Sequence, residues 1–160
     1  MTEPSAEHHL AELNIGRTVA PIDHPTMAEF VDNLERINAL GDGSPGFVWR
    51  LSDETGSATS IRAFEDPRMI LNMTVWESIE DLRKHLYRSD HVEYLRRRRE
   101  WFVPLDEPSL VLWWVPAGHI PTVDEALGRL ERLAAEGPTG QAFTLKAPFP
   151  PADRVPADAG

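Results

Sequence analysis

The alternation of hydrophobic and polar positions divides the first half of the chain into three strands and a helix. Residues 9–15 (HLAELNI) alternate as a strand does, and residues 26–40 carry apolar side chains at helical spacing. The cluster of glycine, serine and proline at 41–46 ends that helix. Residues 47–51 (FVWRL) and 69–76 (MILNMTVW) are two further strands, which we expect to pair as a long hairpin.

The second half of the chain continues with helices around one more strand. Ser78 precedes acidic residues and an apolar stripe, the pattern of a helix start, and a second helical stretch runs over about 89–102. Residues 110–115 (LVLWWV) form a continuous apolar run, which is typical of a central strand buried on both faces. Residues 122–125 (TVDE) are a capping box that opens a last amphipathic helix, and Gly137 ends it.

This order of elements predicts an α+β fold: a ferredoxin-like β-α-β-β-α-β sheet with an extra C-terminal helix. Such a sheet has both crossover helices on one face, so its other face needs a cover. In the run at 110–115, Val111, Trp113 and Val115 point to one face, and Leu110, Leu112 and Trp114 point to the other. A second copy of the chain is the simplest cover, so we expect a symmetric homodimer through the open sheet face.

Length and composition limit the classes of protein that the chain can belong to. Its 160 residues suit one domain, which we place at 8–136, followed by a loosely attached Pro/Ala-rich tail at 137–160. With 16 Lys+Arg against 26 Asp+Glu the net charge is -10, which disfavours nucleic-acid and anionic-membrane partners. The absence of cysteine excludes disulfides, thiolate metal sites and cysteine nucleophiles. No apolar run reaches the ~18 residues of a membrane span, and no signal-peptide pattern opens the chain, so we expect a cytoplasmic protein.

The helical stretch at 89–102 carries the first group of candidate functional residues. Its four arginines do not form one basic patch, because Arg96 and Arg97 share a face with two glutamates. Arg98 and Arg99 instead lie on an arc of aromatic and aliphatic residues. A cation there stacks on an aromatic ring, pairs with an internal acid such as Glu12 or Glu77, or meets an anionic ligand. The residues of this arc that we expect to border a pocket are His91, Tyr94, Arg98, Arg99 and Trp101.

The second group of candidates lies on the strands and on the preceding helix. His85 flanks the apolar stripe of its helix, where it is either a helix-end cap or a general base or ligand. Asn72, Thr74 and Trp76 share one strand face, where they either hydrogen-bond within the dimer interface or orient a ligand. The six histidines lack a metal-binding spacing, so no metal is predicted. The predicted ligand-binding residues are Trp49, Asn72, Trp76, Tyr87, Tyr94, Arg99 and Trp101.

Three segments, FVWRL, NMTVWESIEDLRKHLYRSDHVEYLRRRREWF and VLWWVPAGHIPTVDEAL, together resemble an uncharacterised bacterial family of unknown function. That family belongs to the dimeric α/β-barrel superfamily, alongside the antibiotic-biosynthesis monooxygenases. The resemblance covers about residues 10–143 and implies a dimeric α/β barrel. It implies no reaction, because this superfamily hosts several chemistries on one scaffold.

Three hypotheses of function follow from the candidates and the resemblance. The first is a small-molecule enzyme similar to the cofactor-independent antibiotic-biosynthesis monooxygenases, acting on an aromatic or polyketide-like metabolite. In it, His85 or His91 removes a proton and Arg98 steadies the resulting anion, while tryptophans shape the cavity. The second is a haem protein, with His85 or His91 as the axial ligand and Arg98 pairing a propionate. The third is a non-catalytic ligand-binding or structural dimer.

Overall fold

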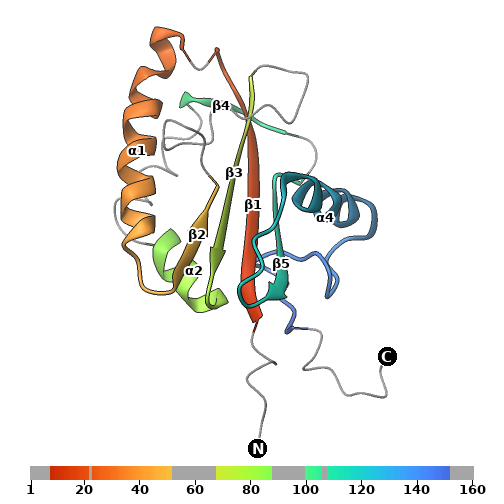
Figure 1. Cartoon of the computed structure of the whole chain (residues 1–160). Helices are drawn as coiled ribbons and strands as arrows, with labels where there is room; N and C mark the ends of the chain where they lie inside the picture. Colours follow the sequence, from red (N-terminus) through yellow and green to blue (C-terminus); the bar gives the residue numbers. More distant parts are fainter. Residues whose placement is uncertain (1–7, 22, 52–67, 88–99, 106–107, 152–160) are drawn as a thin grey trace, which may run out of the picture.

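The computed structural model describes residues 8–21, 23–51, 68–87, 100–105 and 108–151 (Figure 1). Its strands are β1 (His8–Thr18), β2 (Phe47–Arg50), β3 (Met69–Trp76), β4 (Phe102–Val103) and β5 (Leu110–Pro116). Its helices are the 3-10 turn η2 (Pro25–Met27), α1 (Ala28–Asp42), α2 (Ile79–Leu86) and α4 (Val123–Glu136). The predicted order of strands and helices is thus present, with the short strand β4 added to it.

The strands form one antiparallel sheet built around β1. β3 pairs with β1 over 10–17, and β2 pairs with the other edge of β3. On its opposite side, β1 pairs with β5 over 8–14 and with the short β4 at its last two residues. The main sheet therefore runs β2-β3-β1-β5, the arrangement of a split βαβ unit, which confirms the predicted ferredoxin-like α+β fold.

The apolar strand β5 lies at an edge of the sheet, so its prediction as a central strand is wrong. Within the described residues it pairs along its length with β1 alone. On its other side, Leu112 and Phe143 exchange two backbone hydrogen bonds of 2.8 and 2.9 Å. Both faces of β5 are nevertheless covered by packed elements, which is why its sequence is apolar throughout.

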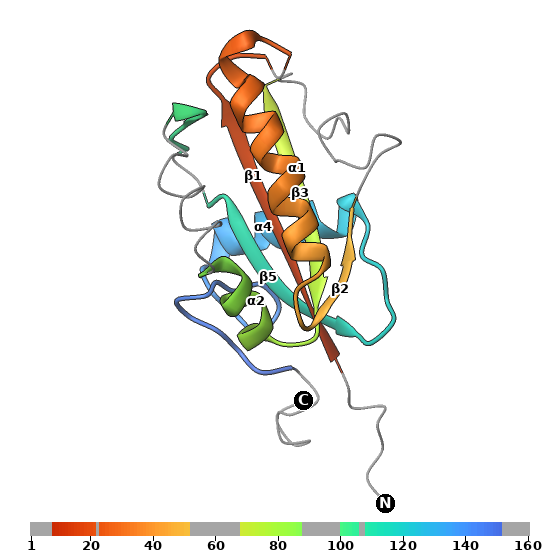
Figure 2. The same ribbon diagram turned by 90° about the vertical axis from the view of Figure 1, so that its left-hand side faces the viewer.

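Helices cover both faces of the sheet. Figure 2 shows α1 and α2 in front of the sheet and α4 behind it. The α4 side holds a core that includes Leu13, Met73 and Trp113, while Leu10, Trp76 and Leu112 belong to the core on the α2 side. The predicted alternation of side chains along β5 is confirmed, because Val111, Trp113 and Val115 belong to the first core and Leu110, Leu112 and Trp114 to the second.

Local capping explains where the helices begin and end. Ser78 Oγ accepts a hydrogen bond of 3.1 Å from the backbone N–H of Asp81, and Thr122 Oγ1 accepts one of 3.0 Å from Glu125, as the sequence predicts. Gly137 ends α4 at a positive φ of 76°. The predicted helix over 89–102 lies mostly outside the described residues, and its last residue, Phe102, is in strand β4.

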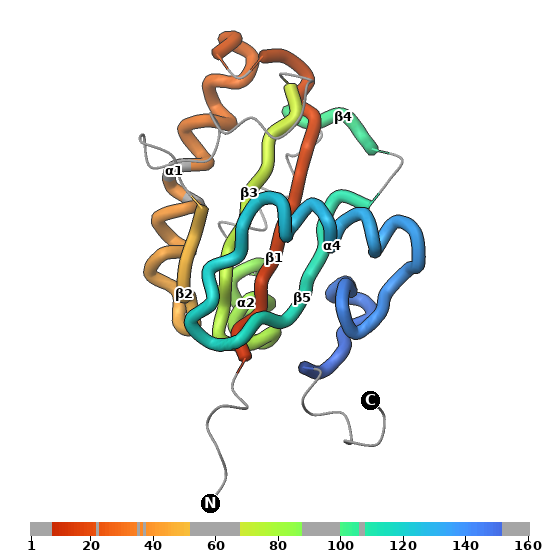
Figure 3. The backbone as a smooth tube through the Cα atoms, turned by 45° about the vertical axis from the view of Figure 1, so that its right-hand side comes forward, coloured from red at the N-terminus to blue at the C-terminus, as the bar shows by residue number. Residues whose placement is uncertain are grey.

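The chain after α4 packs back onto the sheet (Figure 3). Phe143 is fully buried, and the carbonyl oxygen of Phe149 accepts a hydrogen bond of 2.7 Å from Trp114 Nε1. Arg83 on α2 donates a further bond of 2.8 Å to the carbonyl oxygen of Leu145. The expectation of a loosely attached tail is therefore wrong as far as residue 151, while the domain range of 8–136 stays a prediction. Among the described helices, none is long and apolar enough to cross a membrane.

Candidate functional site

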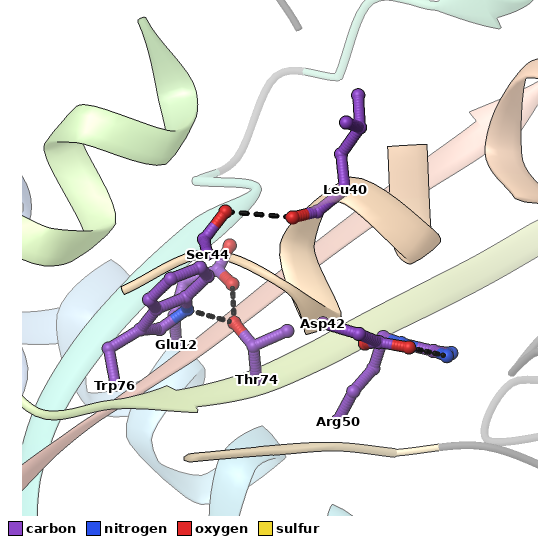
Figure 4. A network of polar contacts seen from close by, with 7 residues as sticks. All are labelled: Glu12, Leu40, Asp42, Ser44, Arg50, Thr74 and Trp76. Atoms are coloured by element: carbon purple, nitrogen blue, oxygen red, sulfur yellow. Dashed lines mark hydrogen bonds and ion pairs between the residues drawn. The ribbon is translucent and has the colours of Figure 1, made fainter. Parts of the chain in front are cut away.

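A buried carboxyl group lies in the middle of β1, on the face of the sheet that α1 and α2 cover. Glu12 is only 4% exposed, and it is paired in register with Thr74 on β3 (Figure 4). Thr74 Oγ1 donates a hydrogen bond of 2.6 Å to Glu12 Oε1, and Asn14 Nδ2 donates one of 2.6 Å to Oε2. Each carboxylate oxygen therefore receives one donor from a neighbouring side chain.

Thr74 links this carboxylate to an indole. Trp76 Nε1 donates a hydrogen bond of 2.9 Å to Thr74 Oγ1, and both side chains are buried. An indole N–H can only donate, so Thr74 accepts from Trp76 and its own proton points to Glu12. The two hydrogen bonds therefore run in one direction: Trp76 donates to Thr74, and Thr74 donates to Glu12.

His85 on α2 completes the cluster from the helix layer. Its imidazole stacks on the Trp76 ring, with centroids 5.1 Å apart and planes 27° from parallel. The end of α1 also lies close to this imidazole, because a Cβ added at Gly41 would lie 3.5 Å from His85 Nε2. Ser44 holds the turn after α1 by donating from Oγ to the carbonyl oxygen of Leu40 at 2.8 Å (Figure 4). Elements β1, β3, α1 and α2 thus meet at this cluster.

Burial changes the acidity of Glu12. Removal from water raises the pKa of the Glu12 carboxyl above its ordinary value, and the hydrogen bonds from Thr74 and Asn14 oppose that rise without cancelling it. A carboxylate with a raised pKa is a stronger base than an exposed glutamate. Proton transfer is therefore the chemistry that this carboxylate best suits.

The structure brings together some of the residues that the sequence singled out. Trp76 and His85 are in contact, and Asn72 lies two residues before Thr74 on the same face of β3, opposite Asn14. The predicted residues His91, Tyr94, Arg98 and Arg99 lie outside the described residues.

The other predicted residues lie apart from this cluster. Trp49 packs against the core on the α4 side of the sheet. Trp101 packs against Phe30 of α1, with ring centroids 5.6 Å apart. Tyr87, just after α2, is 71% exposed. These positions leave the roles predicted for the three side chains untested.

The sequence pattern predicts Glu12 only as a partner for an arginine. For Thr74 it leaves two roles open, a hydrogen bond within the dimer interface or the orientation of a ligand. The signal was present, because Glu12 is the one acid in the strand segment 9–15 and alternation places it on the same face as Leu10. A lone acid on an inward strand face needs partners, and the register between β1 and β3 supplies them.

Haem does not fit His85. The Nδ1 atom of this imidazole is buried, and Nε2 faces the backbone of α1 closely enough that a single added carbon at Gly41 would be in contact with it. An axial ligand needs open space for a macrocycle beyond one ring nitrogen. His91, the other predicted ligand, lies outside the described residues.

A separate groove of about 420 Å³ opens at the start of α2. It lies between Ser78, the Trp114 ring and the C-terminal segment at 148–151, and Glu77 and Glu80 also line it. None of the four side chains Glu12, Thr74, Trp76 and His85 lines this groove. The groove and the buried cluster are therefore two different features.

Comparison with known proteins identifies the family and the fold. A family model described as "Domain of unknown function (DUF3291)" matches residues 9–158. None of the curated proteins matches this sequence. The prediction of a family of unknown function is thus confirmed.

Several solved structures have a similar fold at low sequence identity. SnoaB, a cofactor-independent oxygenase from Streptomyces nogalater, is 17% identical and covers 73% of this chain and 100% of its own, with a TM-score of 0.47. A conserved protein from Methanosarcina mazei Go1 is 11% identical and covers 68% and 94%, with a TM-score of 0.50. A candidate antibiotic biosynthesis monooxygenase from Nitrosomonas europaea is 11% identical and covers 76% and 100%, with a TM-score of 0.46. At these identities the likeness concerns the fold alone.

Proposed function

This chain belongs to the DUF3291 family of unknown function, and we propose that it is a small-molecule enzyme acting on an aromatic or polyketide-like metabolite without a tightly bound cofactor. One observation carries the proposal: a buried chain of hydrogen bonds joins a carboxylate to an indole that stacks on a histidine, all between the sheet and its helices. Titratable groups with perturbed acidity in such a position are typical of catalytic sites.

The chemistry of the cluster supports this substrate class. Trp76 and His85 place two aromatic rings next to the polar groups of Thr74 and Glu12, a composition that suits a planar molecule that also carries hydrogen-bonding oxygens. In the proposed site, the predicted residues His91 and Arg98 complete the pocket, with Arg98 stabilising an anion formed from the substrate. A second copy of the chain, packed near β2 on the other face of the sheet, covers the apolar side chains that α4 leaves partly exposed there.

The experiment is turnover by single variants. We expect purified protein to consume dioxygen with an enolisable aromatic ketone such as 2-tetralone, with no cofactor added. His85→Ala, His91→Ala and Arg98→Ala should each be measured beside His119→Ala, whose side chain bonds to Glu125 at the start of α4. We expect turnover to fall in at least one of the first three variants and to persist in His119→Ala. Full turnover in all of the first three would contradict the proposal.

The haem alternative has its own test. Adding hemin to the purified protein should give no shift of the Soret band that depends on His85, because that imidazole is enclosed by Trp76 and α1. A shift abolished by His85→Ala or His91→Ala would favour haem binding. Binding of aromatic probes without any turnover would favour the non-catalytic alternative.

A further inference from the structure

We propose that Glu12 is the group that accepts the substrate's proton at this site, and that Thr74 is the positioning residue that holds its carboxylate for the transfer. The inference rests on the proposed function and deepens it, because it assigns the base and requires a substrate that is a carbon acid. An enolisable aromatic ketone has the necessary acidic C–H beside a carbonyl group.

The hydrogen bonds around Glu12 are those of an ionised acceptor. Thr74 Oγ1 and Asn14 Nδ2 each donate at 2.6 Å to a different carboxylate oxygen. A carboxylate has about four lone-pair directions, so the donors among the described residues leave each oxygen one direction for a substrate proton. The two donors fix the orientation of the carboxyl group without using up its capacity to accept.

The direction of the hydrogen bonds from Trp76 to Glu12 gives Thr74 a role beyond packing. Its hydroxyl accepts from Trp76 Nε1 at 2.9 Å, which leaves its single proton for Glu12. A valine of the same shape offers neither bond, whereas a serine offers both. Comparison of these two variants therefore separates positioning by the hydroxyl from packing by the side chain.

His85 is less well placed to be the base. One ring face lies on Trp76, the Nε2 edge faces Gly41, and Nδ1 is buried. Burial also raises the pKa of Glu12 above its ordinary value, which makes its carboxylate a stronger base than an exposed one. We therefore assign the proton to the carboxylate and not to the imidazole.

The step balances without an oxidant. The C–H bond next to the substrate carbonyl breaks, its electron pair moves into the carbonyl to give an enolate, and the proton forms a new O–H bond on Glu12. Return of a proton from Glu12 to the same carbon regenerates the ketone and the carboxylate. In deuterated water, the acid proton on Glu12 exchanges, so the cycle introduces deuterium into the substrate.

The first measurement follows deuterium entering 2-tetralone in D2O by proton NMR. We expect the wild-type protein to catalyse the exchange and Glu12→Gln to slow it by about 100-fold or more, the usual contribution of a general base. Thr74→Val should slow the exchange and Thr74→Ser should restore it. The matched control is Glu125→Gln, which removes another carboxylate that accepts from an indole, Trp113 Nε1 at 2.9 Å, at the start of α4. Full exchange in Glu12→Gln together with its loss in His85→Phe would overturn the inference and leave the proposed function standing.

The second measurement needs no turnover. Titration of the Glu12 carboxyl carbon by ¹³C NMR should give a midpoint above the ordinary value of a glutamate. Thr74→Val should move the midpoint further up, because the carboxylate loses a donor, and Thr74→Ser should return it. An unmoved midpoint in Thr74→Val would overturn the positioning role. If 2-tetralone binds beside Trp76 but does not exchange, the inference fails, and if no aromatic probe binds, the proposed function fails.

Discussion

At the scale of single residues, the protein places one acid inside an apolar sheet and surrounds it with donors. Glu12 is buried among strand residues and keeps two hydrogen bonds there, so its charge is supported by dipoles of neighbouring side chains. Such an arrangement costs stability compared with an apolar residue, which is a common property of functional sites. The acid and its donors are therefore better explained by chemistry than by the needs of the fold.

Thr74→Val should destabilise the protein by about 1–3 kcal/mol, because it leaves the Trp76 N–H and one Glu12 oxygen buried without a partner. Thr74→Ser should recover most of that loss. Urea denaturation of wild type, Thr74→Val and Thr74→Ser measures the differences in the free energy of unfolding. Equal stability of wild type and Thr74→Val would mean that water or a rearrangement replaces both bonds.

The contributions of Glu12 and Glu125 to the free energy of unfolding should change in opposite directions with pH. Glu12 has a raised pKa in the folded state, so the folded state holds its proton more tightly than the unfolded state does. The stability of wild type relative to Glu12→Gln should therefore fall as pH rises through the folded pKa. Glu125 behaves in the opposite way. Partial burial acts to raise its pKa, but hydrogen bonds from His119 and Trp113 outweigh burial and lower it. Relative to Glu125→Gln, wild type should lose stability as pH falls through that lowered pKa.

Denaturant unfolding of wild type, Glu12→Gln and Glu125→Gln at acid and neutral pH measures how the free energy of unfolding of each protein changes with pH. Parallel curves for wild type and Glu12→Gln would show that Glu12 has the same acidity folded and unfolded. Burial would then not raise the pKa of the Glu12 carboxyl in the folded protein.

At the scale of elements, two turns show which glycines the fold requires. Gly46 has a φ of 83°, and a Cβ there would overlap the side chain of Asp81 at the start of α2. Gly118 has a φ of 93° with nothing within 4 Å of such a Cβ. The close approach of Gly46 to α2 lets the turn before β2 pack against the helix that carries His85.

Gly118→Ala should cost about 1–3 kcal/mol from backbone strain alone. Gly46→Ala should cost more, because overlap with Asp81 adds to the same strain. Thermal unfolding of both variants measures the difference between their losses of stability. A larger loss in Gly118→Ala would contradict the proposed packing of the turn against α2.

Much of the fold follows from the pattern of the sequence, and the exceptions have physical causes. The bounds of β3 and the caps at Ser78 and Thr122 are local properties, so periodicity and spacing predict them. The edge position of β5 depends on which strands meet in space, and an apolar run shows burial on two faces without showing the neighbours. The packing of residues 137–151 likewise depends on long-range contacts that proline and alanine content does not reveal.

The candidate site was predictable only in part, because some of its contacts join residues that are far apart in the sequence. Trp76 and His85 belong to adjacent elements, so their shared neighbourhood follows from the order of strand and helix. Glu12 and Thr74 are 62 positions apart, and their pairing depends on the register between β1 and β3. Register requires knowledge of both strands at once.

At the scale of the whole molecule, the two faces of the sheet have different covers. The helices α1 and α2 cover the face that carries Glu12, and α4 covers β1 and β5 on the other (Figure 2). On that second face, Val48, Trp49 and Leu51 pack against the core but are only partly buried in the single chain. This leaves apolar surface near β2 for a second copy.

We expect the intact protein to be a homodimer through this face. Native mass spectrometry should give twice the chain mass, and Trp49→Glu should convert it to the mass of one chain. The Glu12 titration should be the same in both forms, because Glu12 lies on the opposite face. A monomer mass for the wild-type protein at all concentrations would contradict the dimer.

We propose that this protein binds its small molecule beside Trp76, on the face of the sheet that α1 and α2 cover. The most direct test follows the indole N–H signals in ¹H–¹⁵N spectra while 2-tetralone is added. Trp76 and Trp113 are both buried and both donate to a side-chain oxygen, but they lie on opposite faces of the sheet. We expect the Trp76 signal to shift with saturation while the Trp113 signal stays in place. A shift of Trp113 with no change at Trp76 would place the ligand on the α4 side of the sheet and overturn the proposed binding beside Trp76.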